Sequence, residues 1–371
     1  MVGMSDHDFP PEDKVRTQPL QFRGRGAVAR PDGRFESMER EAFDDGWGSA
    51  DEALPVPPTE LIIDSAKSVI SYNQSPDVPF DRSINPYRGC EHGCSYCFAR
   101  PTHSYLGLSP GLDFETKIAY KPDAAALLRK ELGKRSYVCA PIALGINTDA
   151  WQPIERKLGI TRAILEVLAE CRHPVSIVTK GSLIERDIDL LADMARDELV
   201  HVMISITTLD RELARKMEPR AAAPQRRLEL LGKLHAAGIP VGVLFAPLIP
   251  ALNDHEMEAV FAAAKDQGAE SAGYVLLRLP YELADMFPQW LHTHVPGRAE
   301  HVMSLLRQMR GGKANSAEFG KRMRGEGLFA ELYAKRAKLA TERLGLNKMR
   351  RALNTQMFKA PREDSGQMSL W

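Results

Sequence analysis

The chain has 371 residues, 44% of them hydrophobic and 26% charged, which is the composition of one large globular domain with extensions. It contains no run of about 18 apolar residues and begins with an acidic stretch, so we expect a cytoplasmic protein without a membrane span or secretory signal. The formal net charge is zero, and five cysteines are too few for a disulfide scaffold.

Residues 1–58 mix glycine, proline and charge with little periodicity, and we predict that they are mostly irregular. From Ser83 onward, short apolar or β-branched runs alternate with amphipathic stretches of helical length, which is typical of repeated βα units. The predicted strands are 83–88, 137–145, 175–179, 200–206, 240–245 and 272–277, and the predicted helices are 122–132, 161–171, 184–196, 225–237 and 254–267.

Six parallel strands with crossover helices are predicted within a core of residues 59–280. A partial barrel and a flat doubly wound sheet both fit this alternation. A helical, basic extension is predicted over 281–360, because twelve lysines and arginines lie between positions 321 and 362 against three glutamates. Residues 361–371 are predicted to form an irregular tail.

Three of the five cysteines crowd into one short segment directly after the first predicted strand. Cys90, Cys94 and Cys97 have the spacing C-x3-C-x2-C. A structural zinc site normally takes four protein ligands, whereas an iron-sulfur cluster held by three cysteines keeps one iron free for a small molecule. The spacing favours a cluster, and a zinc site completed by His92 or His103 is the alternative.

The two remaining cysteines, Cys139 and Cys171, lie in a predicted strand and a predicted helix. Buried cysteines commonly behave as small apolar side chains. We therefore predict that neither of them binds metal.

With Tyr96 directly before its last cysteine, the motif resembles that of the radical S-adenosylmethionine superfamily. Residues 85–117 are similar to the PA0069 family, a group related to spore photoproduct lyase and often labelled DNA repair photolyase-like, and the similarity extends over about residues 59–279. The resemblance implies an α/β fold, a partial (β/α)6 barrel of TIM type with the cluster at its mouth.

The resemblance also implies an enzyme with two cofactors, a four-iron four-sulfur (4Fe-4S) cluster and S-adenosylmethionine. In that superfamily an electron from the reduced cluster cleaves S-adenosylmethionine, and the 5'-deoxyadenosyl radical abstracts hydrogen from substrate. An electron donor such as flavodoxin or ferredoxin is implied. The substrate is not identified, with nucleic acid as a candidate. Cys139 does not align with the radical-quenching cysteine of the lyase, so lyase activity is not assumed.

Polar residues after the predicted strands are candidates for binding S-adenosylmethionine, because barrel active sites lie at the carboxyl ends of strands. Thr148 or Asp149 is expected to accept a hydrogen bond from the methionine ammonium, and Lys180 to pair with the carboxylate. Ser205 and Thr207 are expected to reach the ribose, and Tyr96 is a candidate because it directly precedes the last cysteine. The last candidates are Glu218 and Arg220 on the next loop, where related proteins carry a similar Glu-Pro-Arg run.

Each charged candidate also has a structural interpretation. Asp149 suits a turn or cap, Lys180 suits a surface ion pair, and Glu218 and Arg220 suit a pair with each other.

The last five residues resemble the peptide with which bacterial proteins bind the sliding clamp, with Gln367 at the rim of an apolar pocket and Leu370 and Trp371 inside it. A frayed terminus is the alternative. Together with the basic extension, the tail makes DNA and the clamp expected partners. A non-catalytic nucleic-acid-binding module stabilised by a metal or cluster is the second functional hypothesis.

Overall fold

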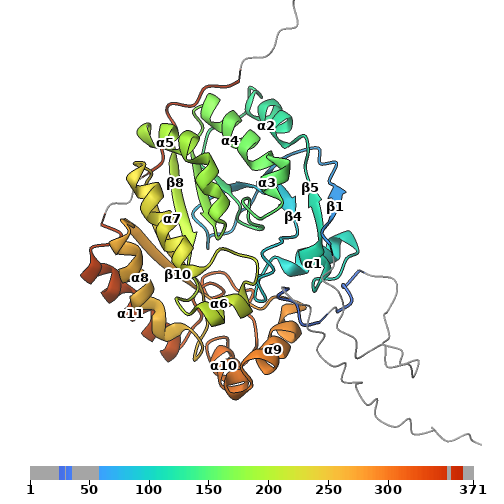
Figure 1. Cartoon of the computed structure of the whole chain (residues 1–371), viewed down its shortest axis with the longest axis vertical. Helices are drawn as coiled ribbons and strands as arrows, with labels where there is room; N and C mark the ends of the chain where they lie inside the picture. The colour runs from blue at the N-terminus through green and yellow to red at the C-terminus, as the bar shows by residue number, and fades with distance from the viewer. Residues whose placement is uncertain (1–24, 30, 36–57, 349–351, 362–371) are drawn as a thin grey trace, which may run out of the picture.

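The computed structural model describes residues 25–29, 31–35, 58–348 and 352–361 (Figure 1). Apart from Pro361, the predicted clamp-binding tail lies outside these residues. Within the described part, no helix is long and apolar enough to cross a membrane.

Among the described residues, the main sheet has seven strands in the order β10-β9-β8-β7-β6-β3-β2. Six of them run parallel, namely β3 (Arg82–Ile84), β6 (Ile142–Leu144), β7 (Val175–Thr179), β8 (Val200–Ser205), β9 (Val241–Leu248) and β10 (Ser271–Leu276). Strand β2 (Ile70–Tyr72) is antiparallel to β3 and ends the sheet, which is not closed. The parallel strands follow chain order without the reversal of a doubly wound sheet, which supports the partial barrel.

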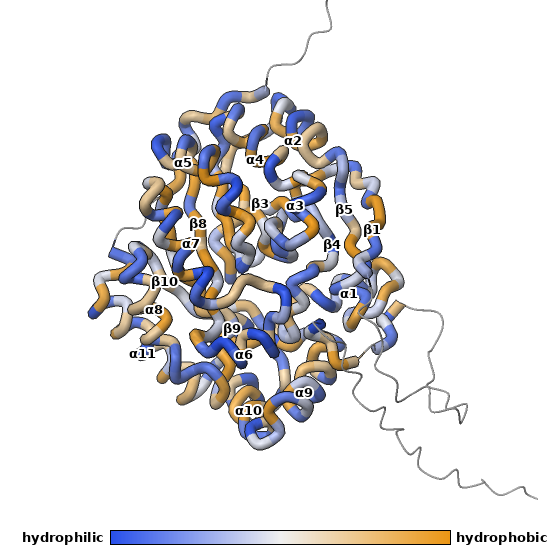
Figure 2. Tube along the Cα trace, in the orientation of Figure 1, coloured by the Kyte–Doolittle hydropathy of each residue, from blue (hydrophilic) through white to orange (hydrophobic). Residues whose placement is uncertain are grey.

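Helices lie in the connections between the parallel strands (Figure 1). They are α2 (Ala124–Leu132), α3 (Glu155–Leu158), α4 (Ile160–Glu170), α5 (Ile188–Arg196), α6 (Arg211–Met217), α7 (Pro224–Ala236) and α8 (Met257–Asp266). Of these, α5, α7 and α8 pack directly on the sheet. Helix α4 buries Ile164, Leu165 and Leu168, a spacing that places one apolar stripe against the core. Hydrophobic residues accordingly concentrate along the inner strands (Figure 2).

The predicted strand 83–88 is two strands. Asn85 and Pro86 interrupt it after β3, since proline has no amide hydrogen for the ladder. The chain then forms β4 (Tyr87–Arg88), which pairs with β5 (Lys117–Tyr120) in a second sheet of order β1-β5-β4, with β1 at Glu60–Ile63. Strands β1 and β5 were not among the predicted strands.

The predicted strand 137–145 is shorter than expected. Only Ile142–Leu144 pair as β6, while Tyr137 packs its ring against His173 and Phe358. The predicted helices 184–196 and 254–267 each begin with a 3-10 turn, Ser182–Asp187 and Asp254–Glu256.

The C-terminal extension is helical in α9 (Leu283–His294), α10 (Pro296–Gln308) and α11 (Leu328–Leu344). Residues 309–327 are not helical, and they bring Met323 beside β10, where its carbonyl accepts a hydrogen bond from the Leu276 amide at 2.9 Å. Helix α11 packs on α8 through an ion pair from Arg336 to Glu258. Part of the basic extension is therefore neutralised by the core.

Candidate active site

The three motif cysteines lie in one loop that follows β4. Cys90 and Cys94 are buried and Cys97 is half-buried. Short turns shape the loop, since the Gly93 amide donates to the Cys90 carbonyl and the Cys97 amide to the Cys94 carbonyl, both at 3.3 Å. Gly93 has a φ of 67°, a left-handed conformation that favours glycine.

The thiols are close enough to influence one another. Burial raises the pKa of Cys90, and the charges of Asp149, Cys94 and Cys97 raise it further. Burial also raises the pKa of Cys94, against the lowering effect of the Lys180 ammonium. Sulfur atoms held like this ionise most readily when a positive metal binds them.

Across the described ranges, no three His, Cys, Asp or Glu side chains converge closely enough to hold a single metal ion. An iron-sulfur cluster makes a different demand, because each cysteine binds a different iron atom. A second fitting feature is the Ser95 hydroxyl, which is buried in the same loop and has no hydrogen-bond partner among the described residues. The donor set and this free hydroxyl fit a cluster with a small molecule beside it.

Arg100 holds the backbone of the cysteine loop through hydrogen bonds. Its guanidinium is fully buried and donates to the carbonyls of Cys94 at 2.9 Å and Gly93 at 3.2 Å. It also forms a buried ion pair with Glu115. The loop backbone is therefore held in place by the protein itself, and the sequence analysis did not single out either partner.

The described part of the N-terminal segment packs against the same loop. The Glu115 carboxylate accepts hydrogen bonds from the amides of Gly26 at 3.0 Å and Ala27 at 2.8 Å. A Cβ atom on Gly26 would lie 1.7 Å from the Gly93 carbonyl oxygen, so only glycine fits there. Residues 25–29 contain no helix or strand, as expected, but their backbone is part of the wall around the cysteines.

Asp149 lies just beyond β6 and binds the end of β7. Its carboxylate accepts hydrogen bonds from the Thr179 hydroxyl and the Lys180 amide, both at 2.7 Å, and lies 3.4 Å from His92 Nδ1. Burial raises the pKa of Asp149, but His92 and the hydrogen bonds outweigh burial and hold this pKa below its usual range. The turn that was its structural interpretation is also present, since Asp149 accepts from the Trp151 amide at 2.9 Å, and binding of the methionine ammonium stays a prediction.

Lys180 places its ammonium over the cysteine loop. The nitrogen lies 5.7 Å from the centroid of the Tyr96 ring, and its charge lowers the pKa of Cys94, Cys97 and Glu218 against the effect of burial. Among the described residues, Lys180 makes no ion pair. The surface ion pair considered as its alternative is therefore not observed. This side chain brings positive charge to the site.

Tyr96, Thr207 and Glu218 meet in one buried network. The Glu218 carboxylate accepts hydrogen bonds from the Tyr96 hydroxyl and, at 2.6 Å, from the Thr207 hydroxyl. Its ion-pair partner is Arg227 of α7, which the sequence analysis missed. Burial raises the pKa of Glu218, but the Arg227 and Lys180 charges outweigh it and lower this pKa.

Glu218 and Arg220 do not pair with each other. Arg220 lies 3.4 Å from Glu91, in the cysteine loop, and its amide donates to the His92 carbonyl at 3.2 Å. The alternative of a Glu218–Arg220 pair is therefore wrong, because Glu218 pairs with Arg227 and Arg220 with Glu91.

Thr148 bonds through its side chain and Ser205 through its backbone carbonyl. The Thr148 hydroxyl donates to the Tyr87 carbonyl at 2.7 Å, and the Ser205 carbonyl accepts from Arg227 at 2.9 Å. Both residues are buried at the carboxyl ends of their strands. Their predicted roles toward S-adenosylmethionine stay predictions.

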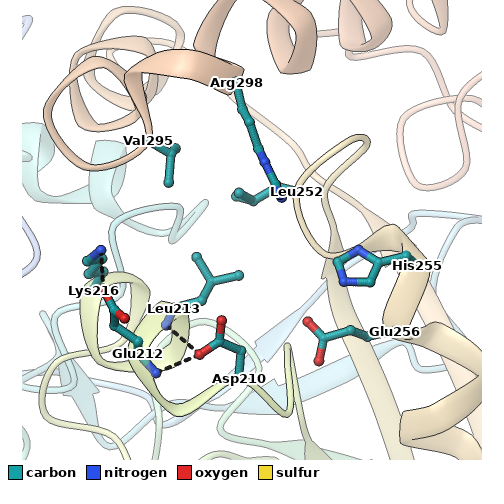
Figure 3. Close-up of a pocket in the computed structure, with 9 residues that line it drawn as sticks. All are labelled: Asp210, Glu212, Leu213, Lys216, Leu252, His255, Glu256, Val295 and Arg298. Atoms are coloured by element: carbon teal, nitrogen blue, oxygen red, sulfur yellow. Dashed lines mark hydrogen bonds and ion pairs between the residues drawn. The ribbon is translucent and has the colours of Figure 1, made fainter.

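A separate open pocket lies outside this network, between α6, the segment after β9 and α10 (Figure 3). Its lining includes Asp210, Glu256 and Arg298, and Asp210 is engaged in capping α6 by accepting from the Glu212 and Leu213 amides. None of the predicted site residues lines it. Its mixed charges do not indicate a ligand.

A family model of the radical S-adenosylmethionine superfamily matches residues 84–264, which run from β3 through the cysteine loop into α8. A protein of Mycobacterium tuberculosis is 37% identical over 233 residues, covering 62% of this chain and 68% of that protein. The chain belongs to the radical S-adenosylmethionine superfamily. This radical S-adenosylmethionine protein is also 28% identical over 197 residues to a protein of Methanocaldococcus jannaschii, covering 53% of the chain and 71% of that protein.

The fold of this superfamily member is similar to that of solved spore photoproduct lyases. One lyase variant superposes with a TM-score of 0.57 at 16% identity, covering 77% of this chain and 80% of the lyase. A lyase variant with bound S-adenosylmethionine (AdoMet) and dinucleoside spore photoproduct gives a TM-score of 0.56 at 16% identity with the same coverage. This likeness confirms the predicted partial barrel.

Proposed function

We propose that the chain is a radical enzyme that binds a 4Fe-4S cluster through Cys90, Cys94 and Cys97 and binds S-adenosylmethionine beside it. The observation that carries the proposal is the placement of these thiols in one pre-shaped loop at the carboxyl edge of six parallel strands. When bound, the two cofactors supply a transferred electron and a 5'-deoxyadenosyl radical that abstracts hydrogen from substrate.

The protein's own residues hold and orient these groups in this proposal. Lys180 pairs with the methionine carboxylate, because its ammonium already lies near the thiols. Tyr96, Thr207 and Glu218 form a rigid hydrogen-bonded wall that excludes water from the site. Asp149 accepts a hydrogen bond from the Lys180 amide and thereby orients the Lys180 side chain toward the cysteine loop.

Anaerobic reconstitution with iron and sulfide, followed by reduction with S-adenosylmethionine present, tests the proposal. We expect iron-sulfur absorbance and 5'-deoxyadenosine. A folded protein that takes up zinc, or that holds a cluster and binds DNA without forming 5'-deoxyadenosine, would instead support the non-catalytic module. Flavodoxin or ferredoxin is the proposed donor, and either should replace a chemical reductant in this assay.

Replacing Lys180 with methionine should weaken S-adenosylmethionine binding about 10-fold to 100-fold while iron content is unchanged, because a charge-assisted hydrogen bond is lost without loss of a metal ligand. Anaerobic calorimetry measures the affinity. Lys265→Met, on the exposed end of α8, is the matched control and should bind normally. Equal affinity in the Lys180 variant and the wild type would remove Lys180 from the site.

DNA is the candidate substrate class that the basic extension supports, and one of the similar solved structures is spore photoproduct lyase complexed with dinucleoside spore photoproduct.

The clamp-binding peptide, outside the described residues, would bring the enzyme to replicating DNA. Trp371→Ala should abolish binding to purified sliding clamp at micromolar concentrations, since aromatic burial dominates such contacts. Trp371→Phe should retain part of the affinity, and binding should change little with salt. Equal binding by Trp371→Ala would disprove the clamp hypothesis.

A further inference from the structure

Two arginine side chains beside β10 carry hydrogen-bond donors that the protein leaves unused. Arg278 follows the carboxyl end of β10, and Arg310 follows α10. The Nε atoms of both are buried and have no partner among the described residues. Arg310 is held against the strand end, because it donates to the Leu277 carbonyl at 2.6 Å. A guanidinium group that keeps a hydrogen-bond donor without a protein acceptor is suited to binding an anion.

The charges around these donors are mostly positive. Burial and the charge of Arg322 lower the pKa of Arg278, and burial and the charge of Arg278 lower the pKa of Arg310 to about 10. The neighbouring carboxylate is that of Asp77, which already pairs with Arg322 and accepts from the Gly320 amide at 2.6 Å. Keeping cations out of water without matching anions is costly, so a bound anion would stabilise this arrangement.

Exposed aromatic rings lie next to the same cations. Phe98 directly follows Cys97, its side chain is 41% exposed, and its ring centroid lies 5.4 Å from the Arg278 guanidinium carbon. Phe319 is 56% exposed, and its ring centroid lies 4.7 Å from the Arg322 guanidinium carbon. Rings beside guanidinium groups recognise nucleotides, because the base stacks on the ring while the cation binds the phosphate.

We propose that Arg278 binds a phosphate group of a nucleotide whose base stacks on Phe98, while Arg310, whose Nη atoms donate to the Leu277 and Arg322 carbonyls, adds positive charge behind it. This inference rests on the proposed function, because the site borders the cysteine loop and would hold the substrate of that radical reaction. An acidic peptide fits less well, since a carboxylate side chain offers nothing to cover the Phe98 ring. The phosphate belongs to a single-stranded polynucleotide or to a free nucleotide, and both present the same chemistry.

The test uses reconstituted full-length protein under anaerobic conditions and a fluorescent single-stranded DNA 12-mer of mixed sequence. We expect Arg278→Gln to weaken binding at least about tenfold. The slope of log affinity against log salt should become less steep by about 0.7, the value for one lost phosphate contact on a single strand. Phe98→Ala should weaken binding without changing this slope. Displacement by millimolar thymidine 5'-monophosphate would assign the site to free nucleotides, and resistance to it would assign the site to a strand.

Arg307→Gln is the matched control, because Arg307 is exposed on α10 and outside the proposed site. Its affinity and salt slope should equal those of the wild type. Where Arg278→Gln fails to fold, Arg278→Lys keeps the charge, loses the forked donors and should bind with intermediate affinity. Wild-type affinity in a folded Arg278 variant, or an equal loss in Arg307→Gln, would overturn the inference. Because iron content and 5'-deoxyadenosine formation are measured separately on wild-type protein, this outcome is distinct from failure of the proposed function.

Discussion

Replacing Cys94 with alanine is expected to remove both the iron-sulfur absorbance and the formation of 5'-deoxyadenosine. Two thiolates cannot hold the proposed cluster against loss of iron, and the open coordination position for S-adenosylmethionine is lost with it. The fold should survive, because Arg100 and Gln152 hold the loop through its backbone and not through the thiols. Iron analysis, visible absorbance and product assay measure these outcomes on one preparation.

Cys171→Ala is the control for that experiment. Cys171 is buried beside the end of α4, where burial raises the pKa of its thiol to about 11, and its carbonyl accepts a hydrogen bond from the Lys359 amide. Its loss removes a small apolar side chain and should leave iron stoichiometry unchanged. A cluster retained in full by Cys94→Ala, or diminished in Cys171→Ala, would show that the ligands are misassigned.

The parallel core was predictable because its strands and helices carry their own signals. Residues 175–179 alternate β-branched side chains that the sheet buries, and the predicted strand coincides with β7. Helix α7 was predicted within one residue at each end, because its apolar residues recur on one face. Strands β1 and β5 are short and lie in a small second sheet, so their sequences lack a clear alternating pattern.

The site was predictable where chemistry depends on local spacing, as in the cysteine motif. Its supporting contacts join residues that only the fold brings together, such as Gly26 with Glu115 and Glu218 with Arg227. Adjacency suggested a partner for Glu218 two residues away, whereas α7 supplies one nine residues away. The sequence did contain a signal for this partner. Arg227 precedes Leu231 and Leu234 by one and two helical turns, which places it on the buried face of α7.

The buried pair of Arg227 and Glu218 provides the largest expected effect on stability. Arg227→Met leaves the Glu218 carboxylate buried without its ion partner, and we expect the free energy of unfolding to fall by about 3–5 kcal/mol. Arg226→Met is the control on the same helix. Arg226 pairs with Glu185 near the surface, and its loss should cost less than about 1 kcal/mol. Urea denaturation of the metal-free protein measures both.

The pH dependence of this loss identifies its cause. In the wild type the pKa of Glu218 is lowered, so the stability that the pair contributes is present above the usual carboxyl pKa and disappears as pH falls toward the lowered value. In Arg227→Met, burial instead raises this pKa, so the penalty is largest at high pH and is relieved once Glu218 binds a proton. The difference between wild type and variant should therefore shrink from pH 8 toward pH 4. A difference that is constant with pH would mean that Arg227 acts through packing and not through its charge.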